Sequence, residues 1–143
     1  MSASRLSIEY YKNLFLSMNV ARFHGKINIA KPVLMLAIIH CIEEGTIIGN
    51  RIVLTKSLIN SYNSIFLSFQ QENITSSIYP YYYLKHEDFY HLIGDTSRKT
   101  PSSKFLREHV EYAALDNELW DLLQDKEIRE EYRQAIIQYF FKR

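Results

Sequence analysis

The feature that most constrains this chain is the apolar run VLMLAIIHCI at residues 33–42. A segment that is apolar nearly all round predicts a helix buried in the middle of a protein. The run is far shorter than the roughly 20 apolar residues that a bilayer span requires, and His40 interrupts it. Pro32 suits the first helical turn, where its missing N–H would have no partner, and Gly45 suits a left-handed stop. The sequence therefore predicts one central helix.

The rest of the sequence indicates a single domain over residues 1–143. It contains no internal repeat, low-complexity tract or Gly/Ser-rich linker, and 47% of the residues are hydrophobic, enough for a core. The N-terminal residues lack the apolar core and cleavage site of a signal peptide. The single cysteine, Cys41, fits a reducing compartment. We therefore expect a cytoplasmic protein that does not associate with a membrane.

Periodicity predicts the order of the first elements. Apolar residues at helical spacing from Ile8 to Met18 predict a first helix after Ser7, and Thr55 is placed to cap a third helix. Between the second and third helices, RIVL predicts a short strand. The run YPYYYLKHEDFYHLI at residues 79–93 predicts a β-hairpin, with KHED as the turn between two aromatic strands.

Three further helices are predicted after a polar loop. They span about residues 103–113, 117–124 and 126–141, and Asp116 and Asp125 precede the last two as caps. Helix, helix, short strand, helix, hairpin is the order of a winged helix-turn-helix, although many α+β domains share it. We predict an α+β, mainly helical fold: a winged helix-turn-helix-like core with a β-hairpin and additional C-terminal helices.

Charge is distributed unevenly along the chain, although the net charge is only +1. Residues 1–60 contain seven Lys or Arg and three Asp or Glu, whereas residues 108–143 contain five and nine. Four basic side chains fall within ten residues: Arg22, His24, Lys26 and Lys31. The last of them lies where the central helix begins, and a helix N-terminus attracts anions. This pattern predicts a phosphate-binding arrangement, with a merely solvated loop as an equal alternative.

Patterns typical of catalytic and metal sites are absent from the sequence. The lone cysteine and the scattered histidines form no zinc-type pair, and the four glycines form no phosphate-binding loop. No nucleophile and base can be nominated from spacing. We therefore expect no metal ion or cofactor, and the sequence gives no support for an enzyme.

Three stretches of the sequence together resemble a known family. They are AKPVLMLAIIHCIEEG from residue 30, YPYYYLKHEDFYHLI from residue 79, and SSKFLREHVEYAALDNELWDLLQDKEIREEYRQAIIQYF from residue 102. In order and spacing they resemble the sulfur-binding domain that precedes HNH nuclease modules in type IV restriction endonucleases, over about residues 5–141. That family reads DNA in which sulfur replaces a non-bridging phosphate oxygen. The resemblance implies a non-catalytic domain of a restriction or defence system that reads phosphorothioate-modified, double-stranded DNA.

The resemblance also implies a binding site. At the helix entrance the family often has His, then Lys or Arg, then Pro, and here Ala30, Lys31 and Pro32 occupy these positions. The Tyr-Pro pair that lines the family's sulfur pocket is matched by Tyr79 and Pro80. The resemblance thus implies that residues far apart in the sequence meet around one sulfur atom.

Two more site positions follow from the resemblance. A pocket position three residues after the proline, which is small in some members, falls on Tyr83, and the downstream basic contact of the family is matched by Lys104. Sulfur is larger and less strongly hydrated than oxygen. If about 40 Å² of its surface were covered, the gain would be on the order of 1 kcal/mol. Most of the affinity must therefore come from Lys and Arg contacts to phosphates, and most of the sequence preference from base edges.

Several functional classes stay open. We expect nuclease activity to reside on a separate HNH module, supplied by a partner nuclease. The alternatives are a winged-helix regulator of unmodified DNA, an enzyme with an unrecognised site, and a protein-interaction module built on the acidic C-terminal helices.

Overall fold

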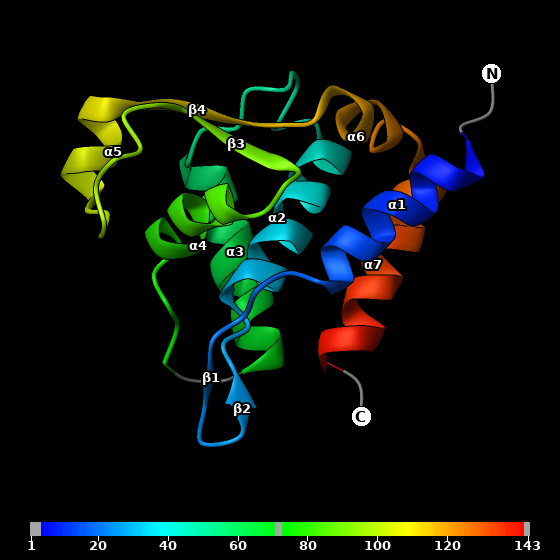
Figure 1. Cartoon of the computed structure of the whole chain (residues 1–143), viewed down its shortest axis with the longest axis horizontal. Helices are drawn as coiled ribbons and strands as arrows, with labels where there is room; N and C mark the ends of the chain where they lie inside the picture. Colours follow the sequence, from blue (N-terminus) through cyan, green and yellow to red (C-terminus); the bar gives the residue numbers. More distant parts are fainter. Residues whose placement is uncertain (1–3, 71–72, 142–143) are drawn as a thin grey trace.

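The computed structural model describes residues 4–70 and 73–141. These residues form an α+β, mainly helical fold (Figure 1). The helices are α1 (Arg5–Leu16), α2 (Ala30–Glu44), α3 (Lys56–Phe69), α4 (Ile78–Tyr83), the 3₁₀ turn η1 (Leu84–His86), α5 (Ser103–His109), α6 (Asn117–Leu122) and α7 (Lys126–Phe141). The strands form two antiparallel pairs: β1 (Arg22–Phe23) with β2 (Lys26–Ile27), and β3 (Tyr90–Gly94) with β4 (Val110–Leu115).

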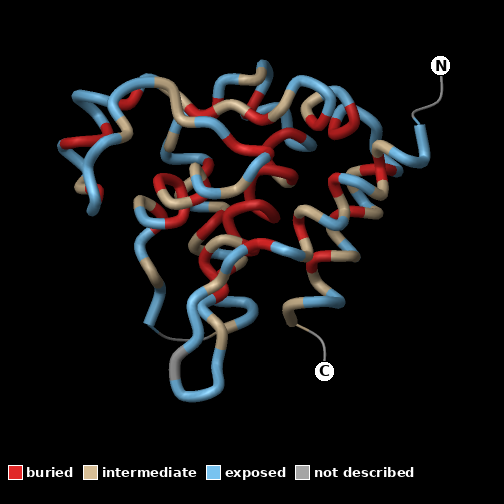
Figure 2. The backbone as a smooth tube through the Cα atoms, in the orientation of Figure 1, coloured by how far each residue is buried: buried red, intermediate tan, exposed pale blue. Residues whose placement is uncertain are grey.

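Helix α2 is the central element, as predicted. Every residue from Pro32 to Ile39 is buried, and α3, α4 and α7 pack against the helix (Figure 2). Gly45 ends the helix with a left-handed φ of 81°, which glycine adopts without a steric cost. Neither α2 nor any other helix among the described residues is long and apolar enough to cross a membrane. The apolar run of the sequence therefore forms the core of the domain.

The predicted caps are confirmed for α3 and α7. The Thr55 hydroxyl accepts a hydrogen bond from the Leu58 N–H at 3.2 Å, and the Asp125 carboxylate accepts one from the Glu127 N–H at 2.8 Å. Helix α1 begins earlier than predicted, because Ser4 rather than Ser7 caps it. Asp116 precedes α6 as predicted, but its side chain makes no capping hydrogen bond. Short polar side chains therefore predicted the starts of α3 and α7 correctly, but not every cap.

The hairpin predicted over residues 79–93 is wrong. Its first half is the helix α4, and only its end forms a strand, β3. Pro80 is the third residue of α4, where a missing N–H costs nothing, whereas in a strand it would remove a ladder hydrogen bond. Tyr81 and Tyr82 are 3% and 0% exposed, so packing against the core overrides the strand preference of tyrosine.

The helix predicted over residues 103–113 is also partly wrong. Helix α5 ends at His109, and β4 continues from it to pair with β3. Ile52 and Ala113 exchange backbone hydrogen bonds of 2.7 and 2.8 Å, so the predicted RIVL strand amounts to one bridge on this sheet. Residues 79–93 therefore do not form the predicted wing. The sheet instead pairs β3 with β4, which lie farther apart in the sequence than the two predicted strands.

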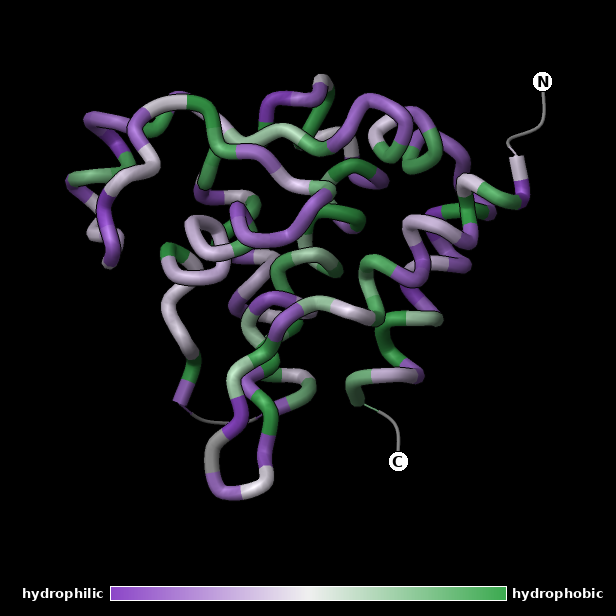
Figure 3. The backbone as a smooth tube through the Cα atoms, in the orientation of Figure 1, coloured by the Kyte–Doolittle hydropathy of each residue, from purple (hydrophilic) through white to green (hydrophobic). Residues whose placement is uncertain are grey.

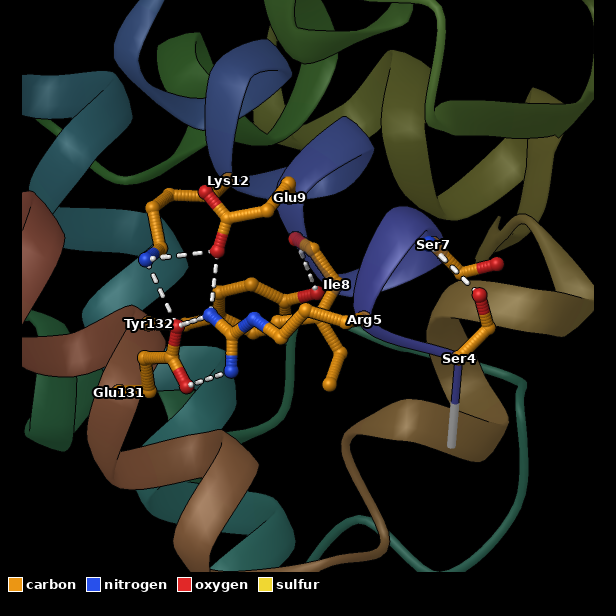
Figure 4. A network of polar contacts seen from close by, with 8 residues as sticks. All are labelled: Ser4, Arg5, Ser7, Ile8, Glu9, Lys12, Glu131 and Tyr132. Atoms are coloured by element: carbon orange, nitrogen blue, oxygen red, sulfur yellow. Dashed lines mark hydrogen bonds and ion pairs between the residues drawn. The ribbon is translucent and has the colours of Figure 1, made fainter. Parts of the chain in front are cut away.

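Helices α1 and α7 are joined by what we call the α1–α7 ion cluster, formed by Arg5, Glu9, Lys12 and Glu131 (Figure 4). The Lys12 Nζ lies 2.7 Å from a Glu131 carboxylate oxygen, and the Arg5 guanidinium contacts both acids. Hydrogen bonds from Arg5 and Lys12 lower the pKa of Glu131 to about 2. Below the cluster, the Tyr132 hydroxyl donates to the Ile8 carbonyl at 3.0 Å. These contacts hold α1 on α7.

Candidate functional site

A hollow of about 440 Å³ lies at the start of α2. Its walls come from the two chain segments that flank the β1–β2 ribbon, from the beginning of α2, and from α4 with η1. The described residues that line it are Asn19, Val20, Ala21, Asn28, Ala30, Lys31, Thr75, Tyr79, Pro80, Tyr83 and His86. We call this hollow the Lys31 pocket. It brings together four residues that the sequence nominated: Lys31, Tyr79, Pro80 and Tyr83.

Lys31 is held in place by an acid. Its Nζ lies 2.8 Å from Oε2 of Glu87, and the two side chains are only 13% and 10% exposed. The same Glu87 oxygen accepts a hydrogen bond from the Asn19 backbone N–H at 3.2 Å. An ammonium group has three N–H donors, so Glu87 occupies one of them. The pair fixes the position of the cation at the pocket wall.

A second part of the lining is aromatic. The rings of Tyr79 and Tyr83 are parallel within 12°, with centroids 6.5 Å apart, and the Tyr83 and His86 rings are related in the same way at 6.3 Å. The Tyr83 hydroxyl donates to the Lys99 carbonyl at 3.0 Å, which fixes its ring. Tyr79 is 38% exposed, so part of its apolar surface is available to a ligand.

Buried hydrogen bonds anchor α4 and therefore the aromatic wall. The Tyr81 hydroxyl donates to the Ile52 carbonyl at 2.7 Å, and the Tyr90 hydroxyl donates to the Tyr81 carbonyl at 2.6 Å. Burial raises the pKa of both tyrosines, so both hydroxyls keep the proton that they donate. Pro80, on the same helix, is buried at the edge of the pocket. The pocket wall is thus tied to the β3–β4 side of the molecule.

Several of the first N–H groups of α2 are already used within the protein. The Ala30 N–H donates to the Asn28 side-chain oxygen at 2.9 Å, and the Val33 N–H donates to the Ile29 carbonyl at 2.9 Å. Pro32 has no N–H, is buried, and is not part of the pocket lining. The attraction for an anion therefore rests mainly on the Lys31 side chain.

The basic loop of the sequence is split between two places. Strands β1 and β2 form a ribbon that projects from the molecule, closed by a two-residue turn in which His24 and Gly25 have φ of 50° and 77° (Figure 1). Both arms of the ribbon carry hydrophilic segments (Figure 3). Arg22 and Lys26 are exposed and line a second hollow of about 810 Å³, at the C-terminal ends of α1, α3 and α7. They flank the Lys31 pocket without lining it.

Lys104 lies apart from these residues. It is exposed on α5, which Figure 1 draws well away from the β1–β2 ribbon, and it lines neither hollow. Conversely, Glu87 and His86 escaped the sequence analysis because we assigned both to a hairpin turn. The spacing of Tyr79, Tyr83 and His86, four and then three residues, is helical and was the signal that could have placed them on one face.

Neither metal-binding groups among the described residues nor comparisons with known proteins add a second candidate site. Within residues 4–70 and 73–141, no group of three or more His, Cys, Asp or Glu side chains is arranged to hold a metal ion. No family model matches the chain, and no curated protein is similar to it. The Lys31 pocket is therefore the feature on which a function has to be argued.

Proposed function

We propose that this chain reads phosphorothioate-modified, double-stranded DNA and that the Lys31 pocket receives the sulfur-bearing linkage. The observation that supports the proposal is one pocket that joins Lys31 to Tyr79 and Pro80, the same residues that the family resemblance nominated. The pocket offers both a cation and apolar ring surface in its lining. A phosphorothioate needs both, because it carries the charge of a phosphate and a larger, less hydrated atom.

The apolar wall provides the preference for sulfur. Covering about 40 Å² of sulfur surface against Tyr79 and Pro80 yields on the order of 1 kcal/mol, which corresponds to about a fivefold preference over oxygen. Oxygen would lose hydration in the same place without an equivalent gain. Lys31 attracts both linkages equally, because both carry one negative charge.

The surroundings of the pocket suit a polyanion. Between residues 13 and 42 the sequence contains no Asp or Glu, whereas it contains Arg22, Lys26 and Lys31. Arg22 and Lys26 are exposed on the ribbon beside the pocket, where they can contact phosphates that neighbour the modified linkage. Such contacts supply most of the affinity of DNA-binding proteins and make it depend on salt.

We propose further that the domain acts with a nuclease in a restriction or defence system. A reader alone marks a site on DNA, so cleavage requires a separate HNH or other nuclease module. Purified protein supplied with Mg²⁺ or Mn²⁺ is expected to leave both modified and unmodified plasmid uncut. Metal-dependent cleavage that persists through further purification would contradict this assignment.

A winged-helix regulator of unmodified DNA is the second candidate. It is favoured by the packing of α3 on α2 and by a β-ribbon, β3–β4, that follows them and would serve as the wing. However, residues 45–55 separate the two helices, whereas a helix-turn-helix has a turn of about three or four residues. Helix α3 also contains a single cation, Lys56, which gives little attraction to phosphates. The Lys31 pocket is the better-supported site.

A competition experiment tests the proposed function. Two synthetic duplexes of one sequence, one with a single phosphorothioate linkage and one without, compete for the protein at fixed salt, and the experiment is repeated over a set of flanking sequences. We expect the modified duplex to win by at least about fivefold for some flanking sequence. Equal competition by the two duplexes at every flanking sequence would leave the winged-helix regulator as the explanation. No binding to either duplex would overturn both proposed functions.

A further inference from the structure

We propose that Glu87 is a built-in competitor of DNA at the Lys31 pocket, which keeps the affinity for unmodified DNA low. This inference rests on the proposed function and concerns the regulation of the same site. It starts from the contact of 2.8 Å between Lys31 Nζ and Glu87 Oε2.

The contact cancels the charge that the pocket presents. No Asp or Glu is among the described residues that line the pocket, yet Glu87 is paired with the cation that does line it. Both side chains are close to nine-tenths enclosed, so water screens the pair weakly. An approaching backbone anion is attracted by Lys31 and repelled by Glu87 over similar distances. The Coulomb attraction that remains is small.

Glu87 is also fixed in this role. Its Oε2 accepts from the Asn19 N–H at 3.2 Å, and its own N–H donates to the Leu84 carbonyl at 2.8 Å at the end of η1. The carboxylate therefore stays beside the pocket when the ligand arrives, instead of swinging into solvent. An anion must share Lys31 with it.

A low affinity for ordinary phosphates is useful to a protein that binds rare modified linkages. Ordinary phosphates greatly outnumber modified linkages, so a strong cationic pocket would be occupied by the wrong DNA. A neutralised pocket binds an ordinary linkage weakly, so the protein does not accumulate on unmodified DNA. Because the Coulomb effect is the same for both linkages, Glu87 sets the affinity for both without changing their ratio.

The test compares Glu87→Gln with Glu43→Gln on matched modified and unmodified duplexes. Each change removes one negative charge, which raises the net charge by one, and each disrupts an ion pair. Glu43 pairs with Arg133 at 3.0 Å near the other end of α2, about 18 Å from Lys31 along the helix. We expect Glu87→Gln to bind both duplexes about tenfold more tightly and to steepen the dependence of log K on log salt by about one unit. Glu43→Gln should change either affinity by less than about twofold, because its charge is more than a Debye length away.

A double variant separates the electrostatic effect from a folding defect. Lys31→Met with Glu87→Gln removes both charges, so the pocket again has the net charge of the wild type, and its affinity for the unmodified duplex should return to within about threefold of the wild-type value. If the wild type binds DNA and Glu87→Gln binds it no more tightly, the inference is overturned and the proposed function is left intact. A similar gain for Glu43→Gln would also overturn it. Failure of both the wild type and Glu87→Gln to bind any duplex would overturn the inference and the proposed function together.

Discussion

The α1–α7 ion cluster and the Lys31–Glu87 pair use the same chemistry in different settings. In the cluster, two cations meet two acids near the surface, where Arg5 and Glu9 are 59% and 45% exposed and Lys12 and Glu131 are 23% and 29% exposed. The Lys31–Glu87 pair is 13% and 10% exposed and lies at the wall of a pocket. A surface cluster stabilises modestly and costs little to build, whereas an enclosed pair has a high desolvation cost. The comparison teaches that the cluster holds two helices together, while the pair at the pocket sets the charge that a ligand meets.

The largest effect is expected from Lys31→Met. The variant should bind modified and unmodified duplexes about tenfold more weakly, and the slope of log K against log salt should fall by about one unit, because one phosphate contact is lost. It should also unfold more easily by about 2 kcal/mol, because Glu87 is left enclosed without its cation. Fluorescence anisotropy titrations at several salt concentrations and chemical denaturation measure the two effects.

A matched change in the α1–α7 ion cluster is the control for Lys31→Met. Lys12→Met removes the same charge from the α1–α7 ion cluster and should leave both affinities within about twofold of the wild-type values, since Lys12 lines neither hollow. Equal losses for Lys12→Met and Lys31→Met would mean that only overall charge matters, and the distinction between the two regions would fail.

A smaller and more selective effect is expected from Pro80→Ala. Under the proposed function part of the Pro80 ring covers sulfur, so binding to the modified duplex should weaken by about 1 kcal/mol and binding to the unmodified duplex much less. Melting temperatures of the variant show whether α4 stays folded. If Pro80 only shapes α4, stability should fall and both affinities should decline together.

The α1–α7 ion cluster should respond to acid without affecting DNA binding. The pKa of Glu131 is lowered from 4.5 to about 2 by Arg5 and Lys12, so its contribution to stability is present above about pH 5 and disappears as the pH falls towards 2. Glu131→Gln should cost about 1 kcal/mol at neutral pH, and the difference from the wild type should shrink over that range. Denaturation curves at pH 7, 4 and 2.5 measure this. A difference that stays constant with pH would contradict the ionic role.

The smallest effect is expected from Lys104→Ala. Lys104 is exposed on α5 and lines neither hollow, so the affinity for either duplex should change by less than about twofold at physiological salt. A loss comparable to that of Lys31→Met would show that the DNA reaches across the molecule to α5, and it would restore Lys104 to the site.

Sequence analysis was most successful where one signal dominated. The apolar run predicted α2, and short polar caps predicted the starts of α3 and α7. It failed at residues 79–93, where tyrosines that favour strands form a helix because Tyr81 and Tyr82 fill the core beside α2. That error hid Glu87, because a residue in a predicted turn is assumed to be solvated. Contacts such as Lys31–Glu87 join residues 56 positions apart, and local pattern does not encode them.

The central claim is that sulfur lies at one defined place, against Tyr79 and Pro80 in the Lys31 pocket. The most direct measurement compares duplexes that contain the pure forms of the two phosphorothioate diastereomers. These duplexes have the same sequence, composition and charge, and they differ only in the direction in which sulfur points. The account predicts that one diastereomer binds about fivefold more tightly than the other, which should match the unmodified duplex within about twofold. Equal affinity for the two diastereomers would contradict a sulfur pocket in this protein.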